Sequence, residues 1–257
     1  MECEGFRSEA CHDTREKEEI MRTIIVVLWL VFFVLSSLIM LPIAWLMKKK
    51  NPVAAQRLSQ KYSTWILKGV VVISGCPVTV KGLDRIPRDE PVLFAMNHRG
   101  IFDILVVYMT VPVLMGFISK KEWKKIPFLR AWMVNCKCLF LDRENPREGL
   151  KTILEGAENI KTGTSMCIAP EGTRNHGDEL LPFKPGSLKM AEKTNCKIVP
   201  IALKNTDAAF ELQAPWIKKV PISVEYGDPI DVASMSKEEK RGLEAIVKER
   251  IETMLKA

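Results

Sequence analysis

The sequence lacks a regular cysteine pattern. Its seven cysteines, an odd number, are scattered at Cys3, Cys11, Cys76, Cys136, Cys138, Cys167 and Cys196. No spacing among them is typical of a disulfide framework, so cysteine usage favours a reducing cytoplasm. Cys136 and Cys138 have no companion ligands at zinc spacing, and their apolar neighbours favour small core residues over a zinc site.

The chain also lacks an internal repeat, a low-complexity tract and a long linker. Its 257 residues fit one α/β domain with an anchor. A formal net charge of +7 is compatible with nucleic-acid binding, but no nucleic-acid-binding motif is present. Residues 1–22 carry a net −3, so the remainder carries +10, a surface that is attracted to anionic lipid headgroups.

Charge is absent from residues 23–47, and Lys48, Lys49 and Lys50 follow at once. These 25 residues are enough to cross a hydrocarbon core of about 30 Å at about 1.5 Å per residue. A cleaved signal peptide is disfavoured because the apolar stretch is too long and an acidic segment precedes it. A buried core helix is the other alternative. We therefore predict an acidic, flexible segment over residues 1–22 and a membrane anchor over residues 23–50.

The anchor's form and orientation follow from the residues in and after it. The anchor can be a straight span or a bent or re-entrant hairpin, because it contains Pro42 and the pair Ser36 and Ser37. The three lysines place the rest of the chain on the cytoplasmic side by positive-inside bias. Residues 51–75 mix cations with aromatic and aliphatic residues, which predicts an interfacial amphipathic helix. A helix packed in the domain is the alternative.

Histidine is scarce, and one of only three lies in the segment Asn97–Asp103. The apolar run 92–96 before this segment predicts a buried strand, and the run 104–107 after it predicts a helix. His98 is then on a strand-to-helix loop, five residues before Asp103.

A catalytic pair is one interpretation of this segment. With a bend that Gly100 permits, Asp103 can hold one ring nitrogen of His98 while the other faces a substrate. His98 would then be a general base. The segment contains no serine or cysteine, so the base would activate a hydroxyl of the substrate. The alternative is an N-capping aspartate beside a core histidine.

Three further apolar runs predict buried strands over residues 139–141, 166–170 and 198–203. Together with 92–96 they predict an α/β fold with a mostly parallel central sheet flanked by helices, within a catalytic domain spanning residues 76–257. In such a sheet a ligand binds beyond the carboxyl ends of the strands, so the loops after these runs can converge on one pocket.

Arginines follow two of these runs. Arg143 comes after the first, and Arg174 closes the sequence Glu171-Gly172-Thr173-Arg174 after the second. The planar fork of arginine matches phosphate oxygens, and backbone amides around Gly172 can donate to an anion. The alternative for each arginine is a salt bridge on a solvated turn.

These blocks, in this order, resemble the 1-acyl-glycerol-3-phosphate (lysophosphatidic acid) acyltransferases of the glycerolipid acyltransferase family. The family's Asn-His-x-Ser-x-x-Asp is matched except at Gly100, and its Phe-Pro-Glu-Gly-Thr-Arg-Ser is matched from Pro170 to Arg174. Phe140, Asp142 and Arg143 match a second block, Val199–Leu203 a fourth, and Phe183–Gly186 the family's Phe-Lys-x-Gly. The resemblance spans residues 76–230.

The resemblance implies a membrane-bound acyltransferase that moves a fatty acyl group from an acyl thioester to the free hydroxyl of 1-acyl-glycerol-3-phosphate, giving phosphatidic acid. His98 and Asp103 would be catalytic. Arg143 and Arg174, with Lys184, would clamp the acceptor phosphate, with Gly172 and Thr173 in the same site. Glu171 would orient Arg174 or the backbone.

No metal or prosthetic group is implied, and acyl-CoA or acyl-carrier protein would be the co-substrate. The expected partners are these substrates and membrane lipids, without nucleic acid. Glycerol-3-phosphate or another lysophospholipid is an alternative acceptor, and a catalytically silent membrane tether is an alternative role. A covalent acyl-cysteine route through Cys167 is disfavoured.

The end of the chain is predicted to complete the fold. Residues 220–226 alternate as a strand does, and Ser236 with Glu239 forms a capping-box pattern before an amphipathic helix.

Overall fold

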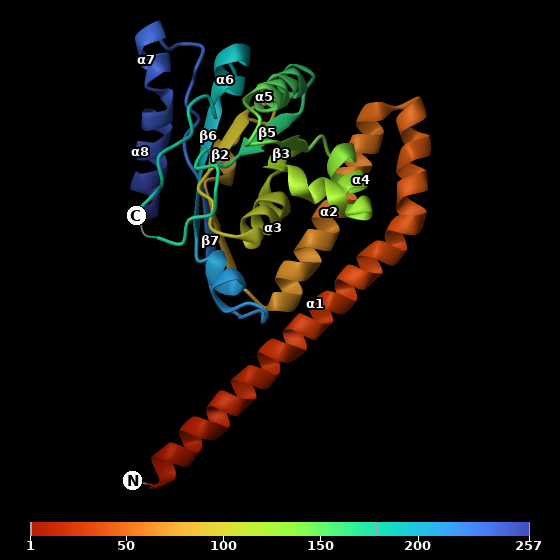
Figure 1. The fold of residues 1–257 in the computed structure, drawn as a ribbon, viewed down its shortest axis with the longest axis vertical. Helices are drawn as coiled ribbons and strands as arrows, with labels where there is room; N and C mark the ends of the chain where they lie inside the picture. The colour runs from red at the N-terminus through yellow and green to blue at the C-terminus, as the bar shows by residue number, and fades with distance from the viewer. Residues whose placement is uncertain (1, 178, 257) are drawn as a thin grey trace.

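The computed structural model describes residues 2–177 and 179–256, with side chains from residue 15 onward. A seven-stranded sheet with the order β1-β7-β6-β2-β5-β3-β4 forms its centre (Figure 1). The strands are β1 (Val78–Lys81), β2 (Leu93–Met96), β3 (Met115–Lys120), β4 (Leu139–Leu141), β5 (Ser165–Ile168), β6 (Ile198–Lys204) and β7 (Ile222–Tyr226). The four predicted apolar runs are β2, β4, β5 and β6.

The sheet is mostly parallel, as predicted. Strands β6, β2, β5, β3 and β4 are parallel neighbours, and β7 is antiparallel to β6 but parallel to β1. The carboxyl ends of five strands therefore meet at one edge.

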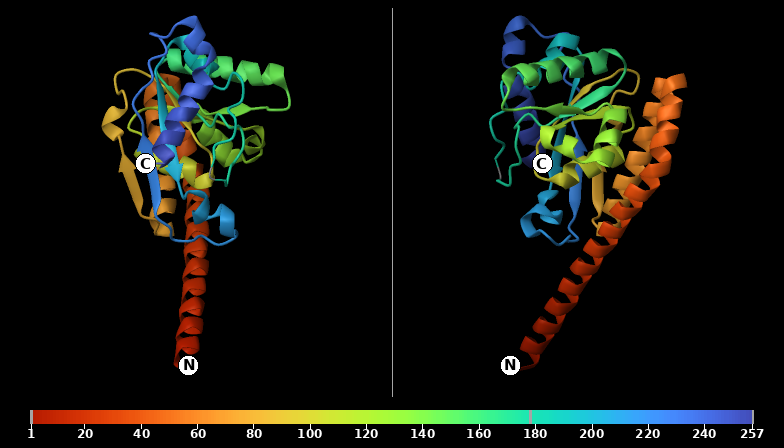
Figure 2. Two further views of the ribbon diagram at one scale, coloured as in Figure 1. Left: turned by 90° about the vertical axis from the view of Figure 1, so that its left-hand side faces the viewer. Right: turned by 45° about the vertical axis from the view of Figure 1, so that its right-hand side comes forward.

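Helices cover both faces of the sheet (Figures 1 and 2). They are α3 (Ile101–Thr110), α4 (Pro127–Asn135), α5 (Pro146–Lys161), α6 (Lys189–Thr194), α7 (Lys237–Arg241) and α8 (Leu243–Lys256), with short 3₁₀ turns η1 (Leu83–Arg85), η2 (Lys121–Lys125), η3 (Asp207–Ala209) and η4 (Glu211–Gln213). Strand β2 divides the core by its alternation: Phe94 and Met96 face the layer of α3, and Leu93 and Ala95 face the layer of α5, α6 and α8.

The predicted C-terminal helix is interrupted. The capping box at Ser236 and Glu239 is present, but α7 ends at Arg241, Gly242 is its C-cap, and α8 begins at Leu243. Leu243, Val247, Ile251 and Met254 lie on the buried face of α8.

An antiparallel pair of helices, α1 (Glu2–Lys50) and α2 (Pro52–Ser74), precedes the sheet. Helix α1 runs through Pro42 without a break, so no hairpin forms within residues 23–47. Among the described residues, it alone is long and apolar enough to cross a membrane, judged by length and composition over Arg15–Lys50. The backbone of α1 is helical from Glu2, and the side chains of residues 2–14 are not described. The flexibility of residues 1–22 stays a prediction.

Helix α2 with its caps Asn51 and Gly75 fills the segment predicted to be interfacial. Its apolar side packs inside the protein, where Tyr62 stacks on Trp132 with ring centroids 4.4 Å apart. An exposed stripe on the other side consists of Arg57, Lys61, Trp65, Lys68 and Val72. The alternative of a helix packed in the domain therefore holds for one face of α2. Contact of the exposed stripe with a membrane stays a prediction.

Candidate active site

His98 and Asp103 form a close pair at the carboxyl end of β2. His98 Nδ1 lies 2.7 Å from Asp103 Oδ2. The Asp103 side chain is fully buried, whereas 19% of the His98 side chain is exposed. A carboxylate only accepts hydrogen bonds when ionised, so Nδ1 carries the proton and Nε2 is the nitrogen that can take one from a substrate.

Asp103 is also part of the cap of α3. Its Oδ2 accepts hydrogen bonds from the backbone amides of Arg99 at 2.8 Å and of Gly100 at 2.9 Å. The carboxylate therefore both caps the helix and orients His98, which unites the two interpretations of the sequence.

The reason predicted for Gly100 was wrong. Its φ of −165° and ψ of −170° are extended values that other residues adopt, so the loop does not depend on glycine flexibility. A β-carbon at this position would instead lie 2.6 Å from Glu211 Cδ and closer still to Oε2, so the end of the Glu211 side chain would have to shift.

Glu171 joins the loops after β2 and β5. Its Oε1 accepts from the His98 amide at 3.0 Å, and its Oε2 accepts from the Leu181 amide at 2.9 Å and from Asn175 Nδ2 at 3.2 Å. The Asn175 amide donates to the His98 carbonyl at 2.8 Å. Glu171, 1% exposed, thus holds backbone groups rather than Arg174.

Gly172, Thr173, Arg174 and Lys184 gather at the turn after β5. Gly172 has φ +73°, where a side chain would be strained, and the stem of Lys184 lies against it. The Gly172 amide itself donates to the Ala169 carbonyl at 3.0 Å, and donation to an anion by other backbone amides around Gly172 stays a prediction. Thr173, Arg174 and Lys184 are exposed.

Arg143 and Arg174 are separated by the strand order. Arg143 follows the edge strand β4, which is two positions from β5 and three from β2. At about 4.8 Å per strand these separations are roughly 10 and 14 Å. Beside Arg143, Lys121 donates to Asp142 at 3.0 Å and lowers the pKa of that carboxyl. The sheet order therefore places the strand before Arg143 further from the loop of His98 than the strand before Arg174, and a shared phosphate site for the two arginines stays a prediction.

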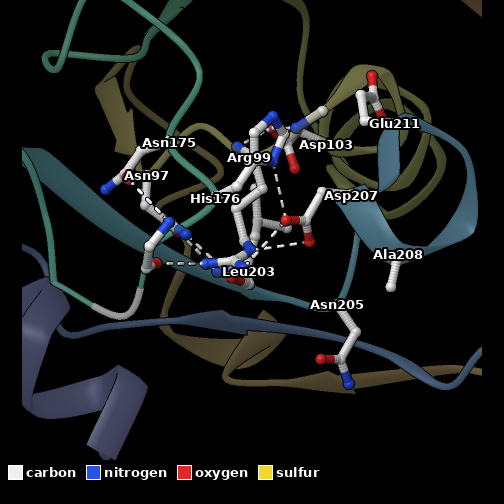
Figure 3. Close-up of polar contacts among 12 residues, drawn as sticks. Asn97, Arg99, Asp103, Asn175, His176, Leu203, Asn205, Asp207, Ala208 and Glu211 are labelled. Carbon is white, nitrogen blue, oxygen red and sulfur yellow. Dashed lines mark hydrogen bonds and ion pairs between the residues drawn. The ribbon is translucent and has the colours of Figure 1, made fainter. Parts of the chain in front are cut away.

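Three residues absent from the predicted site form a polar cluster beside it (Figure 3). The guanidinium of Arg99 donates from Nε and Nη2 to both carboxylate oxygens of Asp207, at 2.9 and 3.0 Å. His176 Nδ1 lies 3.0 Å from Asp207 Oδ2. Burial would raise the pKa of Asp207, but the hydrogen bonds from Arg99 and His176 outweigh it and hold the pKa below its usual value.

Asn97 joins the site to β6. Its amide donates from Nδ2 to the Leu203 carbonyl at 2.9 Å, and its Oδ1 accepts from the Leu203 amide at 2.8 Å (Figure 3). Asp207 and Glu211 then follow β6. The apolar run 198–203 predicted this strand, and ligand sites in such sheets lie beyond the carboxyl ends of the strands. That rule could have pointed to both residues.

Cys167 lies fully buried in β5. Burial is the main cause that raises the pKa of its thiol well above the usual value. The thiolate that a covalent route needs is therefore disfavoured. A cavity of about 840 Å³ lies away from His98, lined by residues that include Lys121, Phe140 and Asp142.

The family model described as Acyltransferase matches residues 77–204. The chain is similar to the 1-acyl-sn-glycerol-3-phosphate acyltransferase of Borreliella burgdorferi, at 29% identity over 191 residues, 74% of this chain and 74% of that protein. It is similar to the same-named protein of Haemophilus influenzae at 32% identity over 167 residues, 63% of this chain and 68% of that protein.

The fold resembles a solved structure. The crystal structure of the 1-acyl-sn-glycerophosphate (LPA) acyltransferase PlsC from Thermotoga maritima matches with a TM-score of 0.81 at 23% identity, covering 94% of this chain and 96% of that chain.

Proposed function

Since the chain belongs to the family of 1-acyl-sn-glycerol-3-phosphate acyltransferases, we propose that it transfers a fatty acyl group from an acyl thioester to the free hydroxyl of 1-acyl-glycerol-3-phosphate, giving phosphatidic acid. The observation that carries the proposal is the 2.7 Å contact between His98 Nδ1 and a fully buried Asp103 carboxylate. This contact fixes the tautomer that a general base needs.

Each residue of the pair has a defined part in the step. His98 Nε2 takes the proton of the acceptor hydroxyl as its oxygen attacks the thioester carbonyl carbon. The new ester C–O bond forms, the C–S bond breaks, and the leaving sulfur takes the proton from His98. Asp103 stabilises the imidazolium between these transfers. Thiolate is a good leaving group, so the step requires neither a strong acid nor a metal ion.

The donor is acyl-CoA or acyl-carrier protein, since both present the fatty acid as a thioester. A direct test compares products formed by the purified protein in detergent from either donor with lysophosphatidic acid, glycerol-3-phosphate or another lysophospholipid. Thin-layer separation identifies the product. Phosphatidic acid as the main product supports the proposal. A different main product assigns the other acceptor, and no product with any pair indicates a silent tether.

The acceptor phosphate is assigned to Arg174 and Lys184, which flank one turn beside His98. Arg174→Lys keeps the charge but loses the planar fork, so we expect kcat/KM for the acceptor to fall roughly 10- to 150-fold, the equivalent of about 1.5 to 3 kcal/mol. KM for the donor should stay nearly unchanged. Saturation curves for each substrate measure both constants.

Arg143→Lys is the matched control for that experiment. The sequence predicted an equal effect for it, but the strand order places Arg143 roughly 10 Å further along the sheet. A smaller effect on the acceptor is therefore expected. If both variants raise only KM for the donor, these arginines bind the donor's carrier and the acceptor site lies elsewhere.

Helix α1 is proposed to attach the enzyme to the membrane, with the catalytic domain on the cytoplasmic side where Lys48, Lys49 and Lys50 lie. A C-terminal reporter tests the side. The attachment is tested by Leu28→Glu, Leu35→Glu and Ile39→Glu together, because these side chains are 61%, 59% and 67% exposed on α1.

The triple variant is expected to lose most binding to phospholipid vesicles, because an acidic residue in the hydrocarbon core costs about 2.5 kcal/mol or more. Vesicle flotation measures the bound fraction. Leu150→Glu with Leu154→Glu, at side chains 49% and 41% exposed on α5, is the control and should bind normally. Equal binding of both variants would reject α1 as the anchor.

A further inference from the structure

Glu211 is a buried carboxylate that belongs to none of the sequence blocks matched to the family. It begins η4, after the end of β6, and 8% of its side chain is exposed. Its Oε1 accepts a hydrogen bond from the Ile101 amide at 2.6 Å, in the first turn of α3. Its Oε2 is buried without a hydrogen-bond partner among the described residues. The carboxylate therefore sits at the positive end of the helix that also carries Asp103.

The same carboxylate reaches the turn after β5. Arg174 Nη1 lies 3.4 Å from Glu211 Oε1, while 42% of the Arg174 side chain remains exposed. Among the described residues, Glu211 is the acidic residue in contact with Arg174, and the partly exposed guanidinium has further donors for an anion. Glu211 thus connects the helix of the catalytic pair with the candidate phosphate-binding arginine.

Gly100 provides the space for this arrangement. The carboxylate of Glu211 lies against the α-carbon of Gly100, and the ideal β-carbon of any other residue would overlap its Cδ and Oε2. The family's first block usually has serine at this position. A side chain at position 100 would therefore require the end of the Glu211 side chain to move.

We propose that Glu211 is a positioning residue that holds Arg174 in the orientation in which it receives the acceptor phosphate, and that Gly100 is its structural complement. The proposal rests on the phosphate role assigned to Arg174. A free arginine side chain loses rotamer freedom when it binds a ligand, and an ion pair formed beforehand reduces that loss. Glu211 itself touches no reacting atom.

Glu211→Gln separates this role from a purely structural one. Glutamine keeps the size of the side chain and an oxygen for the Ile101 amide, but it removes the charge that holds Arg174. We expect KM for the acceptor to rise about tenfold, with smaller changes in kcat and in KM for the donor. A structural role would instead lower the melting temperature and affect both substrates alike, and that result would overturn the proposal.

A double-mutant cycle tests whether Glu211 acts through Arg174. Glu211→Gln in the Arg174→Lys background should add much less than its effect in the unaltered protein. If Arg174→Lys leaves the acceptor constants unchanged, the phosphate assignment itself fails. If Arg174→Lys raises KM for the acceptor but Glu211→Gln does not, the positioning role fails and the phosphate assignment stands.

Gly100→Ser tests the complement. The serine side chain should displace Glu211 and reduce both stability and acceptor use, measured by melting temperature and saturation curves. Glu211→Ala in the same chain removes the overlap, so the double variant should regain the melting temperature while KM for the acceptor stays raised. A Gly100→Ser protein with normal melting and normal acceptor kinetics would contradict the pairing.

Discussion

Replacing His98 by alanine is expected to lower kcat by about 10² to 10⁴ while the protein stays folded and membrane-bound. The side chain supplies the ring nitrogen that takes the acceptor proton, and His176, the other histidine whose side chain the structure describes, is engaged with Asp207. His98 is partly exposed, so its removal leaves no large core cavity. The measurement is kcat at saturating substrate, with the melting temperature and the membrane-bound fraction as controls.

Asp103→Asn separates the charge behind the base from helix capping. An asparagine oxygen in the place of Oδ2 can still accept from the amides of Arg99 and Gly100, so the loop is expected to keep its shape. The same oxygen also accepts from His98 Nδ1, so the variant keeps the tautomer but loses the charge that stabilises the imidazolium. A large loss of kcat with normal melting supports a catalytic pair. Full activity of either variant would contradict the mechanism.

Replacing Arg99 by methionine is expected to lower the free energy of unfolding by about 3 kcal/mol at neutral pH. The change removes the two-point partner of Asp207, which is 1% exposed, and leaves its charge buried with His176 alone. Loss of one partner of a buried pair typically costs about 3 to 5 kcal/mol, and partial exposure of Arg99 places this pair at the lower end. Thermal or denaturant unfolding measures the difference, and Arg147→Met at an exposed position is the control.

The stability that the pair of Arg99 and Asp207 contributes is expected to depend on pH. The pKa of Asp207 is lowered in the folded protein, because the hydrogen bonds from Arg99 and His176 outweigh burial. Stability from the ionised carboxylate is therefore fully present above the ordinary aspartate pKa of about 3.9 and is lost as pH falls through the lower folded value. The difference between the unaltered protein and Arg99→Met should shrink in that acidic range. A difference that stays constant there would show that the ion pair is not its source.

The central sheet could be predicted because its strands are buried on both faces. Continuous apolar runs such as 92–96 and 198–203 are typical of parallel strands that are covered on both faces. The His98 and Asp103 pair was predictable for a related reason, since a short loop between a strand and a helix limits where both side chains can lie.

Other parts depend on contacts that a linear pattern does not carry. The distance of Arg143 from the site depends on the order of the strands in the sheet. That order cannot be predicted from residues 139–143 alone. Asp207 and Glu211 lie on 3₁₀ turns without periodicity, and their partners Arg99 and Arg174 are distant in the sequence. Gly100 was explained by flexibility because the side chain that fills its space comes from residue 211. Helix α2 has both an apolar side and a basic stripe, so composition alone does not decide what covers it.

The peptide of His98 is held at both ends by the loop after β5. Its amide donates to Glu171, and its carbonyl accepts from Asn175. The segment of the general base is therefore joined to the turn that carries Arg174 by two hydrogen bonds, one to the Glu171 side chain and one from the Asn175 backbone. If Arg174 binds the phosphate, this connection contributes to the distance between the bound phosphate and the hydroxyl that reacts. An acceptor whose phosphate and free hydroxyl are separated by a different distance would then fit less well.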